Sequence, residues 1–308
     1  MNENTLTSKY KPLLISAGLG SILGSGIIVS LAGTITVWQN VLNLSASQVG
    51  LISSLLTLSI AAGSLLAGKI TRSLGLIRSF NILNVFFIIG TLLIMTAQNF
   101  WMLMAGTVIA GFFSGADLPV SLTMISHDAP NEKISAELVS GTQVYWTIGI
   151  LLATLSAFAT STLPGAWSPR ICTAIVTLVA VLAVWMRNGS AKIRDLHAQA
   201  PKREQPEDGE KVSVVKLLFG RQTKPYLGFF LCILIFYCGW NLLANTFGQF
   251  QTYMLVKANA SQTFATGAGV ILTIVCLVVA QIFSKIAGGK NRNVAFVIGV
   301  IIMVAALV

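Results

Sequence analysis

Residues 101–137 read WMLMAGTVIAGFFSGADLPVSLTMISHDAPNEKISAE, an apolar run that carries one carboxylate, Asp117, and then passes into a short charged segment. The apolar part is long enough to cross a bilayer, which takes a helix of about 20 residues. Asp117 is the only acidic or basic residue well inside any long apolar run of the chain. Because an ionised carboxylate near mid-bilayer is costly, we expect Asp117 to face the interior of a helix bundle or a water-filled cavity.

The composition of the whole chain is that of a polytopic membrane protein. Of 308 residues, 55% are hydrophobic and 10% are charged, whereas a soluble domain has roughly 25% charged residues. A net charge of +10 would suggest a nucleic-acid partner in a soluble protein. Here the basic residues lie between apolar runs, where they indicate topology and contact with anionic headgroups. The composition therefore predicts a protein of the lipid bilayer, with no nucleic acid as a partner.

Enzyme chemistry has no recognisable signature in this sequence. There is no usable Ser/His/Asp set, no phosphate-binding loop after a strand and no metal-ligand spacing. All four cysteines lie inside apolar runs and are interpreted as small buried hydrophobes: Cys172, Cys232, Cys238 and Cys276. We therefore expect no enzyme activity, no cofactor and no bound metal.

Hydropathy and turn signals predict an all-α fold of about nine transmembrane helices. The expected spans are 13–38, 47–68, 79–97, 101–125, 138–160, 171–186, 226–250, 264–284 and a last one from about 294. Residues 187–224 hold 14 of the 30 charged residues and predict a solvated linker, with room for one amphipathic helix around 212–219. The predicted domains are a six-helix bundle over 1–186, a cytoplasmic linker over 187–224 and an incomplete second bundle over 225–308.

The distribution of Lys and Arg predicts the orientation. With the N-terminus inside, 18 of the 20 basic residues lie on the cytoplasmic side, and cytoplasmic excess is the strongest orientation signal in a sequence. We expect a multi-pass protein of the plasma (inner) membrane with a cytoplasmic N-terminus.

A short internal repeat relates the two predicted bundles. Residues Ala46–Gln48 and Ala260–Gln262 both read Ala-Ser-Gln, each at an expected outer turn before a helix that ends in basic residues. Two parallel bundles of six helices joined by a charged linker are typical of a large class of transporters.

Three stretches of the chain resemble the major facilitator superfamily. Residues 68–78 resemble the family's Gly-x-x-x-Asp-Arg-x-Gly-Arg-Arg loop, with Arg72 at the aspartate position. Residues 115–130 and 138–149 resemble helices 4 and 5 of its sugar-porter and metabolite:proton symporter branches. Family members have twelve helices, so the resemblance implies a C-terminally incomplete chain. It also implies a gating loop that includes Gly68, Arg72, Gly75 and Arg78, and contact between Gln143 and a sugar.

Asp117 is the predicted proton-coupling residue. Burial favours the protonated form of a carboxyl group, and a carboxyl that loads and unloads a proton near neutral pH can drive symport. The alternative is a structural acid that pairs with a cytoplasmic arginine near the helix end.

Amide and aromatic side chains are the predicted solute contacts. Gln143 lies one turn from Trp146, and Asn241, Asn245 and Gln249 share one face of a helix that also carries Trp240. Amides donate and accept hydrogen bonds, as a polar solute requires, although such groups also join helices to one another.

The sequence as a whole predicts a secondary active transporter of a small polar solute, a sugar or related metabolite, driven by protons through alternating access. One alternative is an exporter of drugs or amphiphiles, whose cavity would be lined by aromatics and methionine without the amide stripe. Another is a truncated membrane protein that transports nothing.

Overall fold

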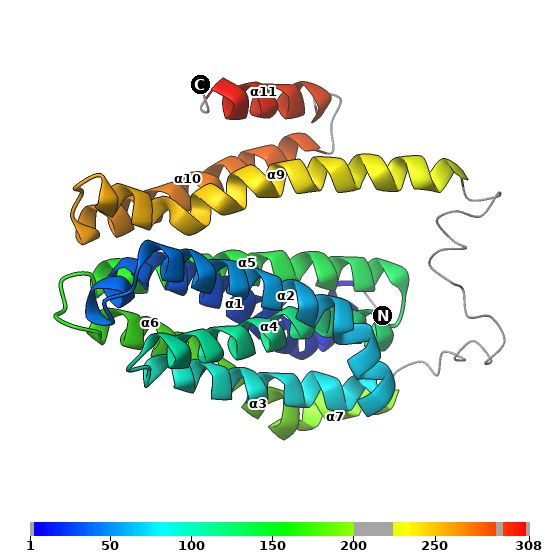
Figure 1. Cartoon of the computed structure of the whole chain (residues 1–308). Coiled ribbons are helices and arrows are strands. Elements are labelled where there is room, and N and C mark those ends of the chain that lie inside the picture. Colours follow the sequence, from blue (N-terminus) through cyan, green and yellow to red (C-terminus); the bar gives the residue numbers. More distant parts are fainter. Residues whose placement is uncertain (1–2, 200–223, 288–291, 306–308) are drawn as a thin grey trace.

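The computed structural model describes residues 3–199, 224–287 and 292–305, and every regular element in these ranges is a helix (Figure 1). The helices are α1 (Glu3–Val41), α2 (Ala46–Leu74), α3 (Leu76–Met95), α4 (Phe100–Asp128), α5 (Glu132–Ala159), α6 (Trp167–Gly189), α7 (Ala191–Gln199), α9 (Lys224–Lys257), α10 (Gln262–Ala287) and α11 (Arg292–Ala305). The predicted all-α class is confirmed, and all nine expected spans correspond to helices. The amphipathic helix expected around 212–219 lies outside the described residues.

Seven helices of the described residues are long and apolar enough to cross a membrane: α1–α6 and α10. Successive helices run in opposite directions, so their connections gather at two ends of the molecule (Figure 1). We call the end with the α1–α2, α3–α4, α5–α6 and α9–α10 connections the turn end. The other end, with the N-terminus and the α2–α3, α4–α5 and α6–α7 connections, is called the basic end.

Side-chain capping explains where α2, α4 and α5 begin. Ser45 caps α2 in a reciprocal capping box with Gln48, which satisfies two backbone N–H groups that a helix start leaves without partners. Asn99 and Asn131 cap α4 and α5 through their side-chain oxygens. The basic segment 69–78, expected as a loop, is helical except at Gly75, whose φ of 85° breaks α2 from α3. Glycine adopts this backbone conformation without the steric penalty of a Cβ.

The C-terminal boundary of the first bundle differs from the prediction. Residue 187 was expected to begin the solvated linker, but α6 continues to Gly189 and Arg187 is 1% exposed. The charge does not end the helix because it meets a carboxylate inside the bundle. The short helix α7 follows and packs back on the bundle through the buried side chains of Ile193 and Leu196.

The first six helices form one packed bundle. α1 contacts α4, α5 and α6, while α2 and α3 both pack on α4. Glycines allow the closest approaches, as at Gly63 of α2, where a Cβ would lie 2.0 Å from the carbonyl oxygen of Phe112. Trp101, Trp167 and Trp185 are exposed at span ends, as an aromatic belt requires, whereas Trp38 is buried in the core.

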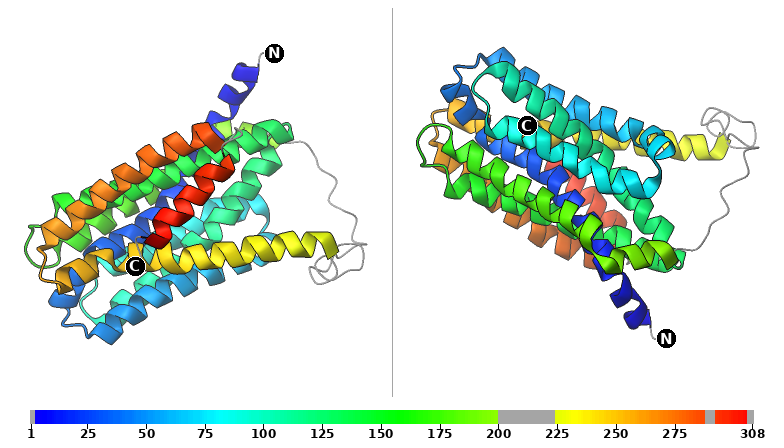
Figure 2. Two further views of the ribbon diagram at one scale, coloured as in Figure 1. Left: turned by 90° about the horizontal axis from the view of Figure 1, so that it is seen from above. Right: turned by 90° about the horizontal axis from the view of Figure 1, so that it is seen from below.

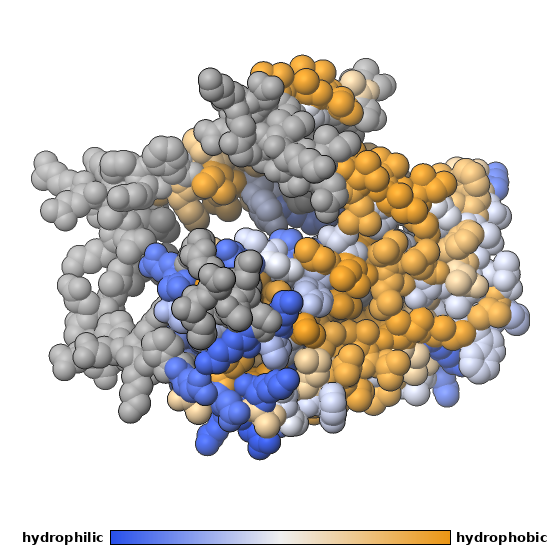
Figure 3. Space-filling model, turned by 180° about the vertical axis from the view of Figure 1, so that it is seen from behind, coloured by the Kyte–Doolittle hydropathy of each residue, from blue (hydrophilic) through white to orange (hydrophobic). Residues whose placement is uncertain are grey.

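The second part, α9 and α10, touches the first bundle mainly near the turn end. α9 contacts α1, and α10 contacts α5. Residues 230–239, in the half of α9 nearer the basic end, are all exposed, whereas residues 249–256 include buried and half-buried positions. α9 diverges from the bundle toward the basic end (Figure 2), and the surface is hollowed between the two parts on that side (Figure 3).

Candidate functional site

Asp117 forms a two-pronged ion pair with Arg187 inside the first bundle. Nη1 of Arg187 donates to Oδ1 of Asp117 at 2.5 Å, and Nη2 donates to Oδ2 at 3.0 Å. Both side chains are buried, with relative exposures of 0% for Arg187 and 1% for Asp117. A guanidinium matches a carboxylate in this planar arrangement, which makes such pairs strong and geometrically specific.

Three helices, α1, α3 and α4, supply the surroundings of this pair. The guanidinium also donates to the carbonyl oxygens of Ser16 on α1 and Phe80 on α3 and to the hydroxyl of Ser121 on α4. Its central carbon lies 3.9 Å from the centre of the Phe80 ring, a cation–π contact. All of the N–H-bearing nitrogens of Arg187 therefore have acceptors, which is the condition for keeping the charge in an apolar interior.

Glycine on α1 makes room for the pair. A Cβ at residue 20 would lie 2.2 Å from Oδ2 of Asp117 and 2.9 Å from Nη2 of Arg187. The close neighbour of Gly20 is therefore the ion pair itself.

This geometry agrees with the alternative role considered for Asp117, a structural acid that pairs with an arginine. The carboxylate faces the interior of the bundle, as expected, but a guanidinium covers it and no exposed group lies in the pair. The arrangement favours a role in holding α1, α3, α4 and α6 together. Proton coupling through Asp117 stays a prediction, and it requires a stage of the transport cycle at which the pair separates.

A second buried carboxylate lies at the basic end of the bundle. Asp128, at the end of α4, is 1% exposed, and its Oδ1 lies 2.8 Å from Nδ1 of His127. Its other oxygen is hydrogen-bonded by Nδ1 of His197 on α7. The Phe80 ring packs edge-on against His197, so this cluster pins α7 to the first bundle.

The predicted solute-contact residues on α5 lie beside α1. Gln143 is exposed and Trp146 is half-buried. The Trp146 ring packs over Gly24 of α1, where a Cβ would lie 3.1 Å from the ring, and its backbone carbonyl accepts a 2.8 Å hydrogen bond from Ser25. The indole is thus held in place while the amide of Gln143 stays accessible.

The predicted amide stripe on α9 divides into two parts. Asn241 donates to the backbone carbonyl of Tyr237, and Asn245 donates to the side-chain oxygen of Asn241, so both bonds stay within α9. Gln249 instead crosses to α2, where it donates to the Ser53 carbonyl at 3.0 Å. Trp240 lies in α9, but its side chain is outside the described part of the chain.

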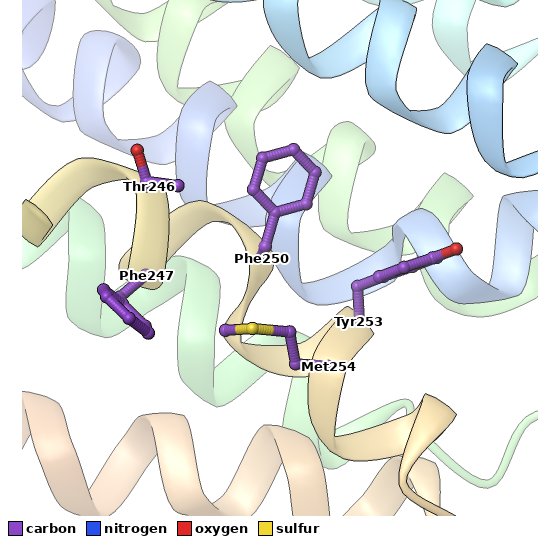
Figure 4. Close-up of a pocket in the computed structure, with 5 residues that line it drawn as sticks. All are labelled: Thr246, Phe247, Phe250, Tyr253 and Met254. Carbon is purple, nitrogen blue, oxygen red and sulfur yellow. The ribbon is translucent and has the colours of Figure 1, made fainter. Parts of the chain in front are cut away.

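A cavity of about 350 Å³ lies against α9 near its turn-end half (Figure 4). Its size is at the lower end of the range for small-molecule sites. The lining residues are mostly aromatic or apolar, and two of them, Thr246 and Tyr253, carry a hydroxyl: Thr246, Phe247, Phe250, Tyr253 and Met254. Sequence reasoning missed these residues because aromatic positions on a membrane helix are also the ordinary sign of packing.

The four predicted gating residues surround the α2–α3 junction. Gly68 and Arg72 lie in the last turns of α2, Gly75 is the junction and Arg78 lies in the first turn of α3. Gly68, Arg72 and Gly75 are exposed. The structure brings them together at the basic end, and their gating role stays a prediction.

Comparison with known proteins identifies the family. The model of the Major Facilitator Superfamily matches residues 14–308. The chain belongs to the major facilitator superfamily. This confirms the resemblance read from the motifs, and the relatives of the chain are transporters, not enzymes.

Two curated bacterial relatives carry transporter names. The chain is 29% identical over 305 residues to the minor myo-inositol transporter IolF of Bacillus subtilis, covering 96% of this chain and 68% of that protein. It is 27% identical over 177 residues to the glucose transporter GlcP of Staphylococcus epidermidis, covering 57% of this chain and 39% of that protein. Among solved structures, a D-xylose-proton symporter matches with a TM-score of 0.66 at 17% identity, over 89% of this chain and 68% of that one. The last likeness concerns the fold alone.

Sequence reasoning also missed the polar contacts of Arg187 and Gln262 with other helices. Arg187 was counted with the charged linker because nothing in its neighbours distinguishes a buried arginine from a solvated one. Gln262 was noticed only as part of the internal repeat, yet it bonds to α1 across the two parts. Its position at a helix start, facing another helix, cannot be read from spacing.

Proposed function

We propose that this major facilitator chain is a secondary active transporter that moves a sugar or a related polyol by alternating access, driven by protons. The name of the myo-inositol transporter that is 29% identical to it supports a polyhydroxylated solute. Amide groups suit such a solute because each can donate to one hydroxyl and accept from another.

One observation carries the transport mechanism. The two parts of the molecule touch near the turn end, while the half of α9 nearer the basic end is exposed. A transporter that is closed at one end and hollowed at the other matches one of the two states that alternating access requires. We propose that the chain lies in the plasma (inner) membrane, with the basic end and the N-terminus facing the cytoplasm.

The proposed solute contacts are Gln143 and Trp146 of α5 and Asn241, Asn245 and Trp240 of α9, of which the Trp240 side chain lies outside the described part of the chain. Trp146 is the best placed to stack on a sugar ring, because Gly24 and Ser25 hold it while part of its face stays accessible. Gln249 is committed to α2 in this state and would reach solute only when its bonds to α2 break.

Tryptophan fluorescence of the chain in nanodiscs tests this proposal. We expect myo-inositol or D-glucose to quench the emission and Trp146→Phe to remove most of the quench. Trp185→Phe is the matched control, because Trp185 is 68% exposed on α6, so the solute-dependent change should survive it. A quench that is unchanged in Trp146→Phe, or absent with both solutes, contradicts the proposal.

A second candidate function, export of an amphiphile, is favoured by the cavity on α9. Its three aromatic rings and one methionine are what that alternative predicts, and its polar groups are the hydroxyls of Thr246 and Tyr253. The same fluorescence measurement with rhodamine 6G separates the two. Quenching by the dye and not by either sugar, removed by Phe250→Ala, would favour export.

A further inference from the structure

Gln262 joins the two parts of the molecule at the turn end through both atoms of its amide. Its Nε2 donates to the backbone carbonyl of Gly33 on α1 at 2.9 Å, and its Oε1 accepts from the hydroxyl of Thr36 at 2.7 Å. Gly33 and Thr36 lie one turn apart on α1, so a single planar amide spans them. Gln262 is half-buried and Thr36 is 2% exposed.

Gln249 repeats this arrangement on another pair of helices. Its Nε2 donates to the carbonyl of Ser53 on α2 at 3.0 Å, and its Oε1 accepts from the hydroxyl of Thr57 at 3.4 Å. In both cases a glutamine of the second part holds a carbonyl and a threonine hydroxyl one turn apart on a helix of the first bundle. A third bond, between the hydroxyls of Ser161 and Thr263 at 3.0 Å, joins the α5–α6 connection to α10.

The internal repeat provides an instructive contrast. Gln48, the residue of the first bundle that matches Gln262, is the third residue of α2 and accepts a 2.9 Å hydrogen bond from the backbone of Ser45. Gln262 is the first residue of α10. The residue before it, Ser261, caps that helix, because its hydroxyl oxygen accepts a 3.1 Å hydrogen bond from the backbone N–H of Phe264. The helix start is therefore shifted by two residues in the second copy. This shift releases the glutamine from capping and directs it to the opposite part.

We propose that Gln262 and Gln249, with their partners on α1 and α2, form a latch that holds the turn end closed and must break each time this end opens. Glutamine suits the task because each of its bonds is neutral and weak, so closure is favoured without becoming permanent. Within the latch Gln262 has the shorter bonds and the more buried partner. The inference rests on the alternating-access proposal, and it assigns the two residues a role in conformational balance while the turn end is closed.

Alkylation of a thiol in the closed interface tests the latch without any solute. In a variant whose four native cysteines are replaced, Ala265→Cys introduces the thiol at a position of α10 that is 0% exposed. Its reaction rate with a membrane-impermeant maleimide, in nanodiscs, then reports the fraction of molecules whose turn end is open. Because no sugar is present, failure of the latch and failure of the proposed solute class are distinguishable.

Gln262→Met keeps the volume of the side chain and removes both bonds. We expect it to raise the alkylation rate roughly fivefold to tenfold, the factor that two interhelical bonds of average strength in a membrane give. Gln48→Met is the matched control and should leave the rate within twofold, because Gln48 bonds only within its own helix start. An unchanged rate in Gln262→Met, or an equal rise in both variants, overturns the proposal.

Gln262→Glu provides a second, independent readout. A protonated carboxyl can still donate to Gly33 and accept from Thr36, whereas a carboxylate can only accept, so it repels the Gly33 carbonyl. The alkylation rate, divided by that of the Ala265→Cys parent at the same pH, should therefore be at least threefold higher at pH 8 than at pH 5.5. A ratio that does not change with pH overturns the proposal, because a side chain that only fills space would give that result.

Discussion

Polar groups hold the first bundle together and join it to α9 and α10 in two different ways. Inside the bundle a full ion pair, Asp117–Arg187, is enclosed by groups from α1, α3 and α4. Between the two parts the hydrogen bonds of Gln249, Gln262 and Ser161 are neutral and join amides and hydroxyls to carbonyls and hydroxyls. The difference indicates that the bundle behaves as a rigid body, while its contacts with the second part can break during a transport cycle.

The largest effect should come from leaving one charge of the bundle without its partner. We expect Arg187→Met to lower the free energy of unfolding by about 3–5 kcal/mol, because it strands a buried carboxylate. The double variant Asp117→Leu with Arg187→Met should recover much of this loss, since it removes both charges. Unfolding of the purified protein in detergent measures both changes, and a single variant as stable as the parent would show that the pair does not hold the bundle.

The double variant also tests the coupling role of Asp117. If this carboxyl carries the transported proton, the variant loses accumulation driven by a pH gradient but keeps solute exchange across proteoliposomes. If accumulation survives, the titrating group is another residue and Asp117 is structural. Loss of accumulation is the outcome predicted from the sequence, and its survival is the outcome that the enclosed geometry of the pair favours.

Close backbone packing inside the bundle predicts an intermediate effect. Gly63→Ala places a Cβ 2.0 Å from the carbonyl oxygen of Phe112, and overpacking of this kind costs about 1–3 kcal/mol. Gly68→Ala, five residues later on α2, is the control, because its Cβ meets no described atom within 4 Å. The unfolding temperature should fall for Gly63→Ala and change little for Gly68→Ala. Equal shifts in the two variants would refute the packing argument.

The smallest effect is expected for Gln249→Met at the junction of the two parts. Its hydroxyl contact is 3.4 Å long, compared with 2.7 Å in Gln262, so its removal should raise the alkylation rate of the thiol at Ala265→Cys about twofold to threefold. The unfolding temperature should stay close to that of the parent. A rise as large as that of Gln262→Met would show that the two glutamines contribute equally.

Most of the fold could be predicted because lipid imposes a simple rule on the sequence. Apolar runs between charged segments predicted nine helices, and the main errors were at their ends. The basic residues before and after Gly75 are helical and not a loop, and α6 continues through Arg187. The motifs of residues 68–78 and 115–149 indicated the family. These signals are local, and local signals are what a single sequence carries best.

The partners of the polar residues could not be predicted. Asp117 was identified as buried, but Arg187 is 70 residues away in the chain and its charge suggested a solvated segment. From the sequence, Gln249 was interpreted as a solute contact and Gln262 as part of a repeat. An amide on a membrane helix looks the same in a sequence whether it binds solute or a neighbouring helix. Only the arrangement of helices decides between these roles.

Gly75 imposes an unusual kind of restriction on the connection between α2 and α3. With φ at 85° and no described atom within 4 Å of a Cβ built there, the site excludes other amino acids by chirality and not by lack of room. A residue of opposite handedness would meet less resistance at this joint than L-alanine. The direction in which the chain leaves α2 is therefore fixed by the backbone stereochemistry of a single residue, even though there is space for a side chain at that position.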